Sequence, residues 1–178
     1  PLTRDLARLG AEVSLGLRDP ERWKQAVQRA EQAVTLPTRD YRDALWLANV
    51  YQATDQSARA ETLLQTTLEQ ARHVPDVWIA WLDHLAREGR RDLGLKELER
   101  MKKTLTGPRL MWALPRGFEA LRMVAEADAA YQKVLRDATN DVGLLAQGAD
   151  FYRRAGRDAE AQTYYERLLD PALAAPPD

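Results

Sequence analysis

The chain has 178 residues, of which 45% are hydrophobic and 30% are charged, so it can form both a core and a solvated surface. Its 26 basic and 27 acidic residues give a formal net charge of −1, which argues against a general attraction to nucleic acid or anionic membranes. The absence of cysteine excludes disulfides and thiolate metal sites, and no apolar run of about 18 residues predicts a membrane span.

The chain begins with PLTRDLARLG, which has no basic region followed by an apolar core, so we expect no secretory signal peptide. Because it also begins without methionine, we expect a processed product or a segment of a longer protein. The sequence does not indicate a compartment.

Residues 1–40 predict an irregular pair of helices. The dipeptide Asp19-Pro20 predicts the turn between them, in which the aspartate caps the second helix and the proline opens it. Three apolar residues spaced four apart predict the buried face of the first helix: Leu9, Val13 and Leu17. The second helix carries three small residues, Ala26, Ala30 and Ala33.

Four further segments begin about 34 residues apart, and each is predicted to be a helix pair. Their boundaries are 41–74, 75–107, 108–141 and 142–170, and a tail rich in proline and alanine follows at 171–178. In the first helix of each segment, apolar residues recur at the helical period. They are Ala44, Leu47, Ala48 and Tyr51; Trp78, Trp81, Leu82 and Leu85; Met111, Leu114 and Phe118; and Leu145, Gly148, Ala149 and Tyr152.

A turn and a second helix complete each segment. The predicted turns lie at Asp55, Gly89, Arg122 and Gly156. Each second helix then has a small residue, which permits close approach of the two helices, and a larger residue four positions later. These residues are Ala60 and Leu64, Gly94 and Leu98, Ala127 and Tyr131, and Ala161 and Tyr165. One pair cannot bury its apolar face alone, so we expect neighbouring pairs to stack.

This pattern resembles the tetratricopeptide repeat family. The residues that carry the resemblance are Trp78, Leu82, Leu85, Gly89, Gly94 and Leu98, and then Gly148, Tyr152, Gly156, Ala161 and Tyr165. It covers about residues 7–170 and implies an all-α, right-handed superhelical α-solenoid of about five antiparallel helix pairs. It also implies that ligands bind in a concave groove lined by the first helices. The chain departs from the family pattern at Arg122, where a glycine is usual, and at Gly10, where a bulky residue is typical.

The adjacent Asp83 and His84 in DVWIAWLDHLAREGR raise the question of an acid–base pair. On a helix they point about 100° apart, so their side chains do not face each other. In the repeat frame, His84 lies beside the apolar stripe and Asp83 points toward the inner surface. We therefore interpret His84 as a structural residue.

Catalysis is not indicated elsewhere. The only other histidine, His73, has no zinc-ligand spacing with His84, and there is no phosphate-binding glycine loop and no nucleophile elbow. The sequence therefore predicts a protein that is not an enzyme, with no cofactor and no metal site.

The first-helix positions that lie between the core residues are candidates for a partner-binding groove. They are Arg42, Trp46, Asn49, Asp83, Arg87, Arg109, Trp112, Arg116, Asp150 and Arg153. The second half of this set is rich in arginine, which favours a carboxylate-bearing protein or peptide partner. The expected function is a non-catalytic protein–protein interaction scaffold.

Three alternatives stay open. Trp46 and Trp112 are either anchors for a partner or packing residues between helix pairs. The arginines either bind a partner or form a solvated face balanced by nearby carboxylates. The stretch WIAWLDHLAREG also resembles the half-a-tetratricopeptide repeats of RNA-processing proteins, although the mildly acidic balance argues against nucleic-acid contact.

Pro115 predicts a distorted helix between Pro108 and Met123, because proline removes a helical hydrogen bond. The alternative is a helix that begins at Pro115 after a separate turn at residues 109–114. At the other end of the chain, Pro171 stops the last helix without a polar capping helix. Leu168 and Leu169 are therefore expected to face a missing neighbour, a partner or a second copy.

Overall fold

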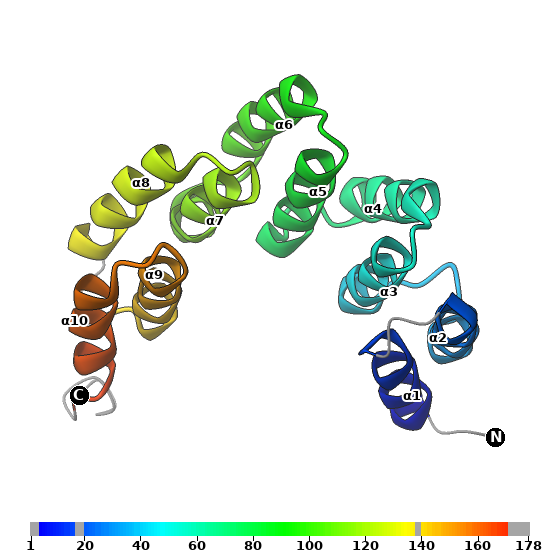
Figure 1. Cartoon of the computed structure of the whole chain (residues 1–178). Helices are drawn as coiled ribbons and strands as arrows, with labels where there is room; N and C mark the ends of the chain where they lie inside the picture. Colours follow the sequence, from blue (N-terminus) through cyan, green and yellow to red (C-terminus); the bar gives the residue numbers. More distant parts are fainter. Residues whose placement is uncertain (1–3, 17–19, 138–139, 171–178) are drawn as a thin grey trace, which may run out of the picture. The chain divides into compact units, whose positions relative to one another are not determined.

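The computed structural model describes residues 4–16, 20–137 and 140–170, and these contain ten helices and no strand (Figure 1). The chain divides into two compact units, Pro1–Leu105 (unit 1) and Thr106–Asp178 (unit 2). Unit 1 contains α1 (Arg4–Gly16), α2 (Pro20–Ala33), α3 (Tyr41–Ala53), α4 (Ser57–Gln70), α5 (Pro75–Arg87) and α6 (Arg91–Thr104). Unit 2 contains α7 (Gly107–Ala120), α8 (Val124–Asp137), α9 (Val142–Arg154) and α10 (Asp158–Leu168).

Consecutive helices pair through short turns, which confirms the predicted all-α fold of helix pairs. Four of these turns place one residue in the left-handed region, with φ of 57° at Asp55, 68° at Gly89, 60° at Arg122 and 70° at Gly156. These are the four turn positions that the sequence predicted. The right-handed winding of a complete solenoid stays a prediction of the sequence.

Each of the four turns closes by the same two backbone bonds. After α5, the Arg90 N–H donates to the Leu85 carbonyl at 2.9 Å and the Gly89 N–H donates to the Ala86 carbonyl at 3.2 Å. Equivalent bonds follow α3, α7 and α9. This is the Schellman arrangement, which satisfies the last carbonyls of the helix and requires a residue with positive φ.

The core of unit 1 follows the predicted stripes of α3 and α5. Every predicted apolar residue of both helices is buried, and Trp78 and Leu82 are completely inaccessible. The Trp78 indole N–H donates to the Arg72 carbonyl at 2.7 Å, so the buried ring leaves no unpaired donor. The predicted small residues Ala60 and Gly94 of the facing second helices are also buried.

The predicted buried face of α1 is wrong. Leu9 and Val13 are each 57% exposed, and Leu17 lies outside the described residues. The buried face consists of small side chains, Ala7, Ala11 and Ser14. They allow α1 to approach α2, on which Ala26, Ala30 and Ala33 are buried as predicted. At the same contact, the Arg29 guanidinium donates to the Gly10 carbonyl and to the Ser14 hydroxyl, both at 3.0 Å.

Unit 2 has an aromatic core. Phe151 stacks on Tyr131 with ring centroids 4.7 Å apart, and Tyr152 stacks on Tyr164 at 5.5 Å. The stripe of α9 is buried as predicted, and Gly148 is needed there because a Cβ would lie 2.6 Å from a Leu135 methyl. The predicted small residues Ala127 and Ala161 are buried as well.

The predicted stripe of α7 is only partly correct. Met111 and Phe118 pack against the core of unit 2 but are half-buried, as is Leu114. The fully buried residues of this helix are Ala113, Pro115, Gly117 and Ala120. The close-packed face of α7 is therefore built from small and imino residues, which a search for large apolar side chains does not identify.

Pro115 lies inside α7, which is one helix from Gly107 to Ala120. The alternative in which the helix begins at Pro115 is therefore wrong. Because proline has no N–H, the carbonyl of Met111 receives no helical bond from this position. A bend at Pro115 stays a prediction of the sequence.

Candidate functional site

His84 is completely buried beside the apolar stripe of α5, where the repeat spacing placed it. Its ring stacks on Trp81 with centroids 5.6 Å apart, and its Nδ1 lies 3.1 Å from the Gln52 amide nitrogen of α3. Burial lowers the pKa of His84, although the nearby carboxylates of Glu88 and Glu61 oppose the shift. Asp83 instead pairs with Arg87 one turn later, at 2.7 Å.

In unit 1, the first-helix surface is organised around Trp46 of α3. The Arg8 guanidinium of α1 lies 4.8 Å from the centre of the Trp46 ring and also pairs with Asp43. The Trp46 indole N–H donates to a Glu12 carboxylate oxygen at 3.3 Å. Trp46 therefore packs between α1 and α3, and because it is half-buried it also presents part of its ring at the surface.

The other candidates in unit 1 are more exposed. Arg42 and Asn49 are exposed on α3, and Arg42 lies over the Tyr41 ring at 5.1 Å. On α5, Arg87 is exposed and its charge is balanced by Asp83. This surface thus combines one aromatic ring with polar groups of both signs.

In unit 2, the candidates of α7 form one row. Arg109, Trp112 and Arg116 follow one another at three- and four-residue steps and so share a face of the helix. The Arg116 guanidinium stacks on the Trp112 ring at 4.3 Å from its centre. The Trp112 indole nitrogen also lies close to Gly143, at 3.9 Å from the position that a Cβ would occupy. Trp112 is half-buried, and Arg109 is exposed.

The candidates of α9 are partly engaged with other residues of unit 2. Asp150 accepts a hydrogen bond from the Tyr165 hydroxyl at 2.7 Å and lies 3.7 Å from Arg153. Arg153 is exposed. The neighbouring Arg154 pairs with Glu119 of α7 at 2.5 Å, which joins the two first helices of unit 2.

Ion pairs join neighbouring second helices in both units. Arg90, at the start of α6, pairs with Glu61 of α4 at 2.5 Å. Arg157, at the start of α10, pairs with Asp128 of α8 at 2.8 Å, and Asp128 also accepts from the Tyr152 hydroxyl at 3.0 Å. Burial would raise the pKa of Asp128, but hydrogen bonds from Arg157, Tyr152 and Gln132 outweigh it and hold that pKa below its ordinary value.

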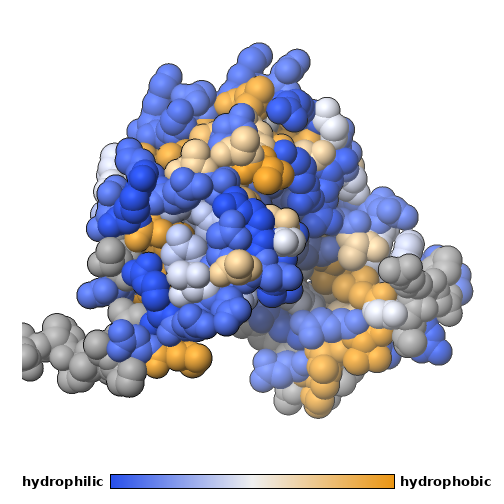
Figure 2. Space-filling view, turned by 60° about the vertical axis from the view of Figure 1, so that its left-hand side comes forward, coloured by the Kyte–Doolittle hydropathy of each residue, from blue (hydrophilic) through white to orange (hydrophobic). Residues whose placement is uncertain are grey.

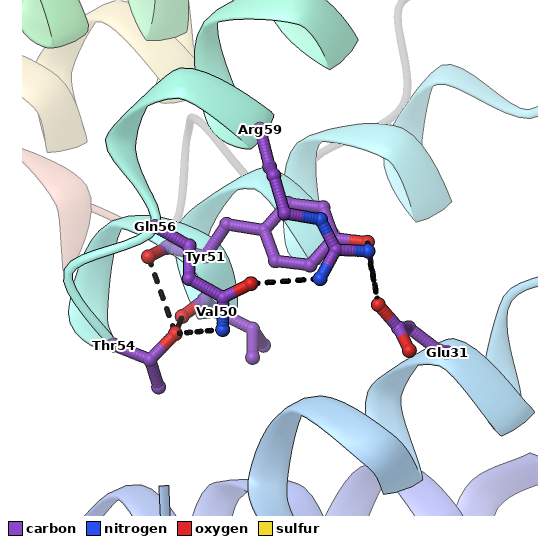
Figure 3. A network of polar contacts seen from close by, with 6 residues as sticks. All are labelled: Glu31, Val50, Tyr51, Thr54, Gln56 and Arg59. Carbon is purple, nitrogen blue, oxygen red and sulfur yellow. Dashed lines mark hydrogen bonds and ion pairs between the residues drawn. The ribbon is translucent and has the colours of Figure 1, made fainter. Parts of the chain in front are cut away.

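Between α2 and α4, a different set of residues forms the polar contacts (Figure 3). Arg59 of α4 stacks over Tyr51 at 4.2 Å and donates to the Tyr51 hydroxyl at 2.9 Å. Glu31 of α2 pairs with Arg59 and accepts from the Tyr51 hydroxyl at 3.1 Å. Burial and the charge of Glu31 raise the pKa of Tyr51, while Arg59 opposes them.

A cleft of about 590 Å³, which the repeat pattern of the sequence does not predict, lies beside this network and is lined mainly by residues 36–38 and by α4. Two signals in the sequence point toward it. The segment that joins α2 to α3 is long, residues 34–40, whereas α4 and α5 are joined by residues 71–74. The exposed row of α4 that contains Ala58, Thr62 and Thr66 also carries no charge.

Other kinds of site are not evident in the part of the chain that the structure describes. No group of three or more potential metal ligands comes together among those residues. None of the described helices has the length and apolar character needed to cross a membrane. In the view of Figure 2, hydrophobic side chains form separate patches among hydrophilic ones.

No family model matches the sequence, and no curated protein matches it. Among solved structures, the chain resembles TTC0263, a thermophilic TPR protein in Thermus thermophilus, with a TM-score of 0.52 and 17% identity over 94% of this chain and 95% of that one. It also matches MamA 41-end from Desulfovibrio magneticus RS-1, with a TM-score of 0.46 and 14% identity over 98% and 97% of the two chains. MamA AMB-1 matches with a TM-score of 0.44 and 21% identity over 95% and 99%. The likeness to TTC0263 shows that the chain has a tetratricopeptide-repeat-like fold of stacked helix pairs.

Proposed function

We propose that the chain is a non-catalytic protein-interaction scaffold whose first helices bind a segment of a partner protein. The observation that carries the proposal is the row of Arg109, Trp112 and Arg116 on α7. In this row an indole ring is held by a stacked guanidinium and remains partly accessible. Tryptophan and arginine are the residue types most often found at the energetic centre of protein interfaces.

The charge of this row favours an acidic partner. Arg109 is exposed at the beginning of α7, and Arg153 is exposed near the end of α9. Guanidinium groups bind carboxylates through paired, charge-assisted hydrogen bonds. In unit 1, a surface of mixed charge is proposed to bind a protein segment by itself, through Arg42, Trp46, Asn49, Asp83 and Arg87.

A second contact is proposed at the end of α10. Leu169 is 81% exposed and Leu168 is half-buried, so an apolar pair lies at the last helix of unit 2. A partner or a second copy of the chain would remove this surface from water. The proline- and alanine-rich tail at 171–178 lies outside the described residues.

A pull-down from the source lysate tests the first-helix surface. The bait is the full chain, either wild type or with Arg109→Glu, Arg116→Glu and Arg153→Glu together, and each lysate is used with and without nuclease treatment. We expect a protein that the wild type captures after nuclease treatment and that the triple variant captures at about one tenth of that level or less.

A matched control carries Lys133→Glu and Arg136→Glu, which reverse two exposed charges on α8 of the same unit. This control should capture the partner as the wild type does. Equal capture by the triple variant would remove the proposed surface. Capture that disappears with nuclease would favour an RNA-associated repeat protein instead. Circular dichroism of each bait verifies that the helices are intact.

A further inference from the structure

The cleft beside α4 lies on the second-helix layer of unit 1 and is separate from the first-helix surface. Its floor contains Tyr51 and Thr67, which are buried, and its walls contain Leu36, Ala58, Thr62 and Thr66, which are exposed. It is therefore open along α4. Residues 58–70 of the helix border it, a length of about 18 Å.

The threonine hydroxyls of the cleft already have partners within the chain. The hydroxyls of Thr62, Thr66 and Thr67 donate to the carbonyls four residues earlier, at 3.0, 2.9 and 2.7 Å. The Thr38 hydroxyl oxygen accepts from the Asp40 N–H at 3.1 Å. The exposed parts of these walls thus resemble an apolar surface, with methyl groups and the side chains of Leu36 and Leu63.

The charge in the cleft is balanced. Arg59 is the charged residue among those that line it, and it pairs with Glu31 and bonds the Gln56 amide oxygen at 2.7 Å. A charged ligand would have to break this pairing or lose its hydration without compensation. The chemistry of the cleft therefore favours an uncharged occupant.

Comparison with the next second helix supports this conclusion. One repeat later, α6 carries Asp92, Lys96 and Arg100 at the positions that correspond to Ala58, Thr62 and Thr66. All six residues are exposed. The row of α4 therefore carries no charge where the row of α6 carries three charged residues.

The ion pair between second helices is also displaced at this place. The two ion pairs, Glu61–Arg90 and Asp128–Arg157, lie at equivalent positions of the repeat. One repeat before Glu61 and Arg90, the corresponding residues are Val27 of α2 and Gln56 of the turn before α4, and neither is charged. Glu31 and Arg59 replace that pair about one helical turn further along each helix. The position that carries the ion pair between α4 and α6 and between α8 and α10 is therefore uncharged beside the cleft.

We propose that this cleft binds an uncharged, apolar segment of a protein partner, which lies along α4 and places an aliphatic side chain between Leu36 and Leu63. A length of about 18 Å accommodates five or six extended residues. A polypeptide suits an open cleft because it continues beyond both ends, whereas small-molecule sites bury most of their ligand. The inference does not depend on the first-helix surface, because it uses none of its residues.

Selection of peptides tests the inference. A library of random 12-residue peptides displayed on phage is selected against the immobilised full chain, and the enriched peptides are synthesised with a fluorescent label. We expect enriched peptides with an uncharged aliphatic centre. Fluorescence polarisation should show about tenfold or more weaker binding to Thr66→Lys, because the new ammonium group would lie against the apolar segment.

Two further variants locate the contact. Gln65→Lys places the same charge on an exposed position of α4 that does not line the cleft, and it should leave affinity unchanged. The variant with Arg109→Glu, Arg116→Glu and Arg153→Glu should also bind these peptides as the wild type does. Failure of the first-helix proposal can therefore be distinguished from failure of the cleft proposal. Lysine is at least as favourable in a helix as threonine, so Thr66→Lys should fold.

Several results would overturn the inference. Equal binding by Thr66→Lys and wild type would place the peptides elsewhere on the chain. Enrichment of acidic peptides alone, all of which lose binding to the arginine variant, would assign the peptides to the first-helix surface and leave the cleft without a ligand. Failure of the selection to enrich any uncharged peptide would mean that the cleft does not recognise an apolar segment.

Discussion

Two junctions between second helices use the same types of residue at different repeat positions. One lies between α2 and α4 in unit 1, and the other lies between α8 and α10 in unit 2. In both, an arginine stacks on a buried tyrosine and pairs with an acid of the preceding second helix. In unit 2 the pair occupies the regular repeat position, and the Asp128 side chain is 24% exposed. In unit 1 the pair is displaced, and the Glu31 side chain is 40% exposed.

This difference shows what a repeat conserves physically. The stacked arginine and the bonded tyrosine hydroxyl occur in both junctions, although Arg59 lies within α4 and Arg157 lies at the start of α10. A buried tyrosine hydroxyl needs a hydrogen-bond partner, and a carboxylate near it needs a cation. These requirements can be met from more than one sequence position. The displaced solution leaves an uncharged surface, and the cleft lies beside it.

Removal of the two acids should give the largest difference between the units. Asp128→Ala should destabilise the chain by about 1–2 kcal/mol, because it leaves the Tyr152 hydroxyl without its acceptor and removes one of the two carboxylates, Asp128 and Glu160, that pair with Arg157. Glu31→Ala should cost less than about 1 kcal/mol, because its carboxylate is more exposed to water. Urea denaturation at pH 7 measures both free energies of unfolding.

The pH dependence gives a control for this prediction. The folded-state pKa of Asp128 is lowered, so its stabilisation is present above the unfolded-state value of 3.8 and is lost as the pH falls through the folded-state pKa. The difference between wild type and Asp128→Ala should therefore shrink at acidic pH. If Glu31→Ala destabilised the chain as much as Asp128→Ala, the two junctions would be energetically equivalent.

Substitutions in the turns should change the free energy of unfolding by less, and they should raise it. Arg122 in unit 2 and Asp55 in unit 1 have left-handed φ values of 60° and 57° without being glycine. Arg122→Gly should stabilise the chain by about 0.5–1 kcal/mol, and Asp55→Gly by only a few tenths, because aspartate tolerates this conformation better than arginine. The increase in Tm by calorimetry measures the effect.

The matched control for the turns is Gly89→Ala. This variant should be less stable, because alanine is strained at the φ of 68° that Gly89 adopts. If Arg122→Gly lowered the Tm, the side chain of Arg122 would contribute more to stability than its backbone conformation costs.

The smallest expected difference between the two units is their loss of stability in mild acid. Both histidines of the chain belong to unit 1, and the folded-state pKa of the buried His84 lies below its ordinary value of 6.5. A lowered histidine pKa means that the unfolded chain takes up a proton first, so stability decreases as the pH falls below about 6.5. Amide hydrogen exchange of α3–α5 should accelerate between pH 7 and pH 5, after correction for intrinsic rates, more than that of α8–α10.

The variant His84→Gln provides the comparison, because it keeps hydrogen-bonding capacity without a titrating group. It should reduce the difference in pH dependence between the two units. An equal response of α8–α10 would show that groups other than His84 cause the loss of protection.

The sequence was sufficient where one large apolar stripe dominated a helix. The stripes of α3, α5 and α9 and the four left-handed turns lie where the repeat spacing predicted them. In α1, two faces have helical periodicity, one with Leu9 and Val13 and one with Ala7 and Ala11. The structure buries the alanines because they match the small residues of α2, and this choice depends on the partner helix.

The candidate surfaces were predictable as helix faces, but their contacts were not. Helical spacing places Arg109, Trp112 and Arg116 in one row, whereas the stack of Arg116 on Trp112 depends on side-chain conformation. The cleft beside α4 depends on the path of residues 36–38, which periodicity does not specify. Its uncharged row was visible in the sequence, but only a comparison between neighbouring repeats gives it meaning.

The Schellman turns also bear on how the length of such a chain is changed. Each turn is closed by bonds between residues at most five positions apart, and no bond from another helix pair is needed to form it. The residues of one helix pair are therefore sufficient to form the turn between its two helices. Duplication or deletion of one whole pair would leave the remaining turns chemically complete, so arrays of different length can be engineered without redesign of their hairpins.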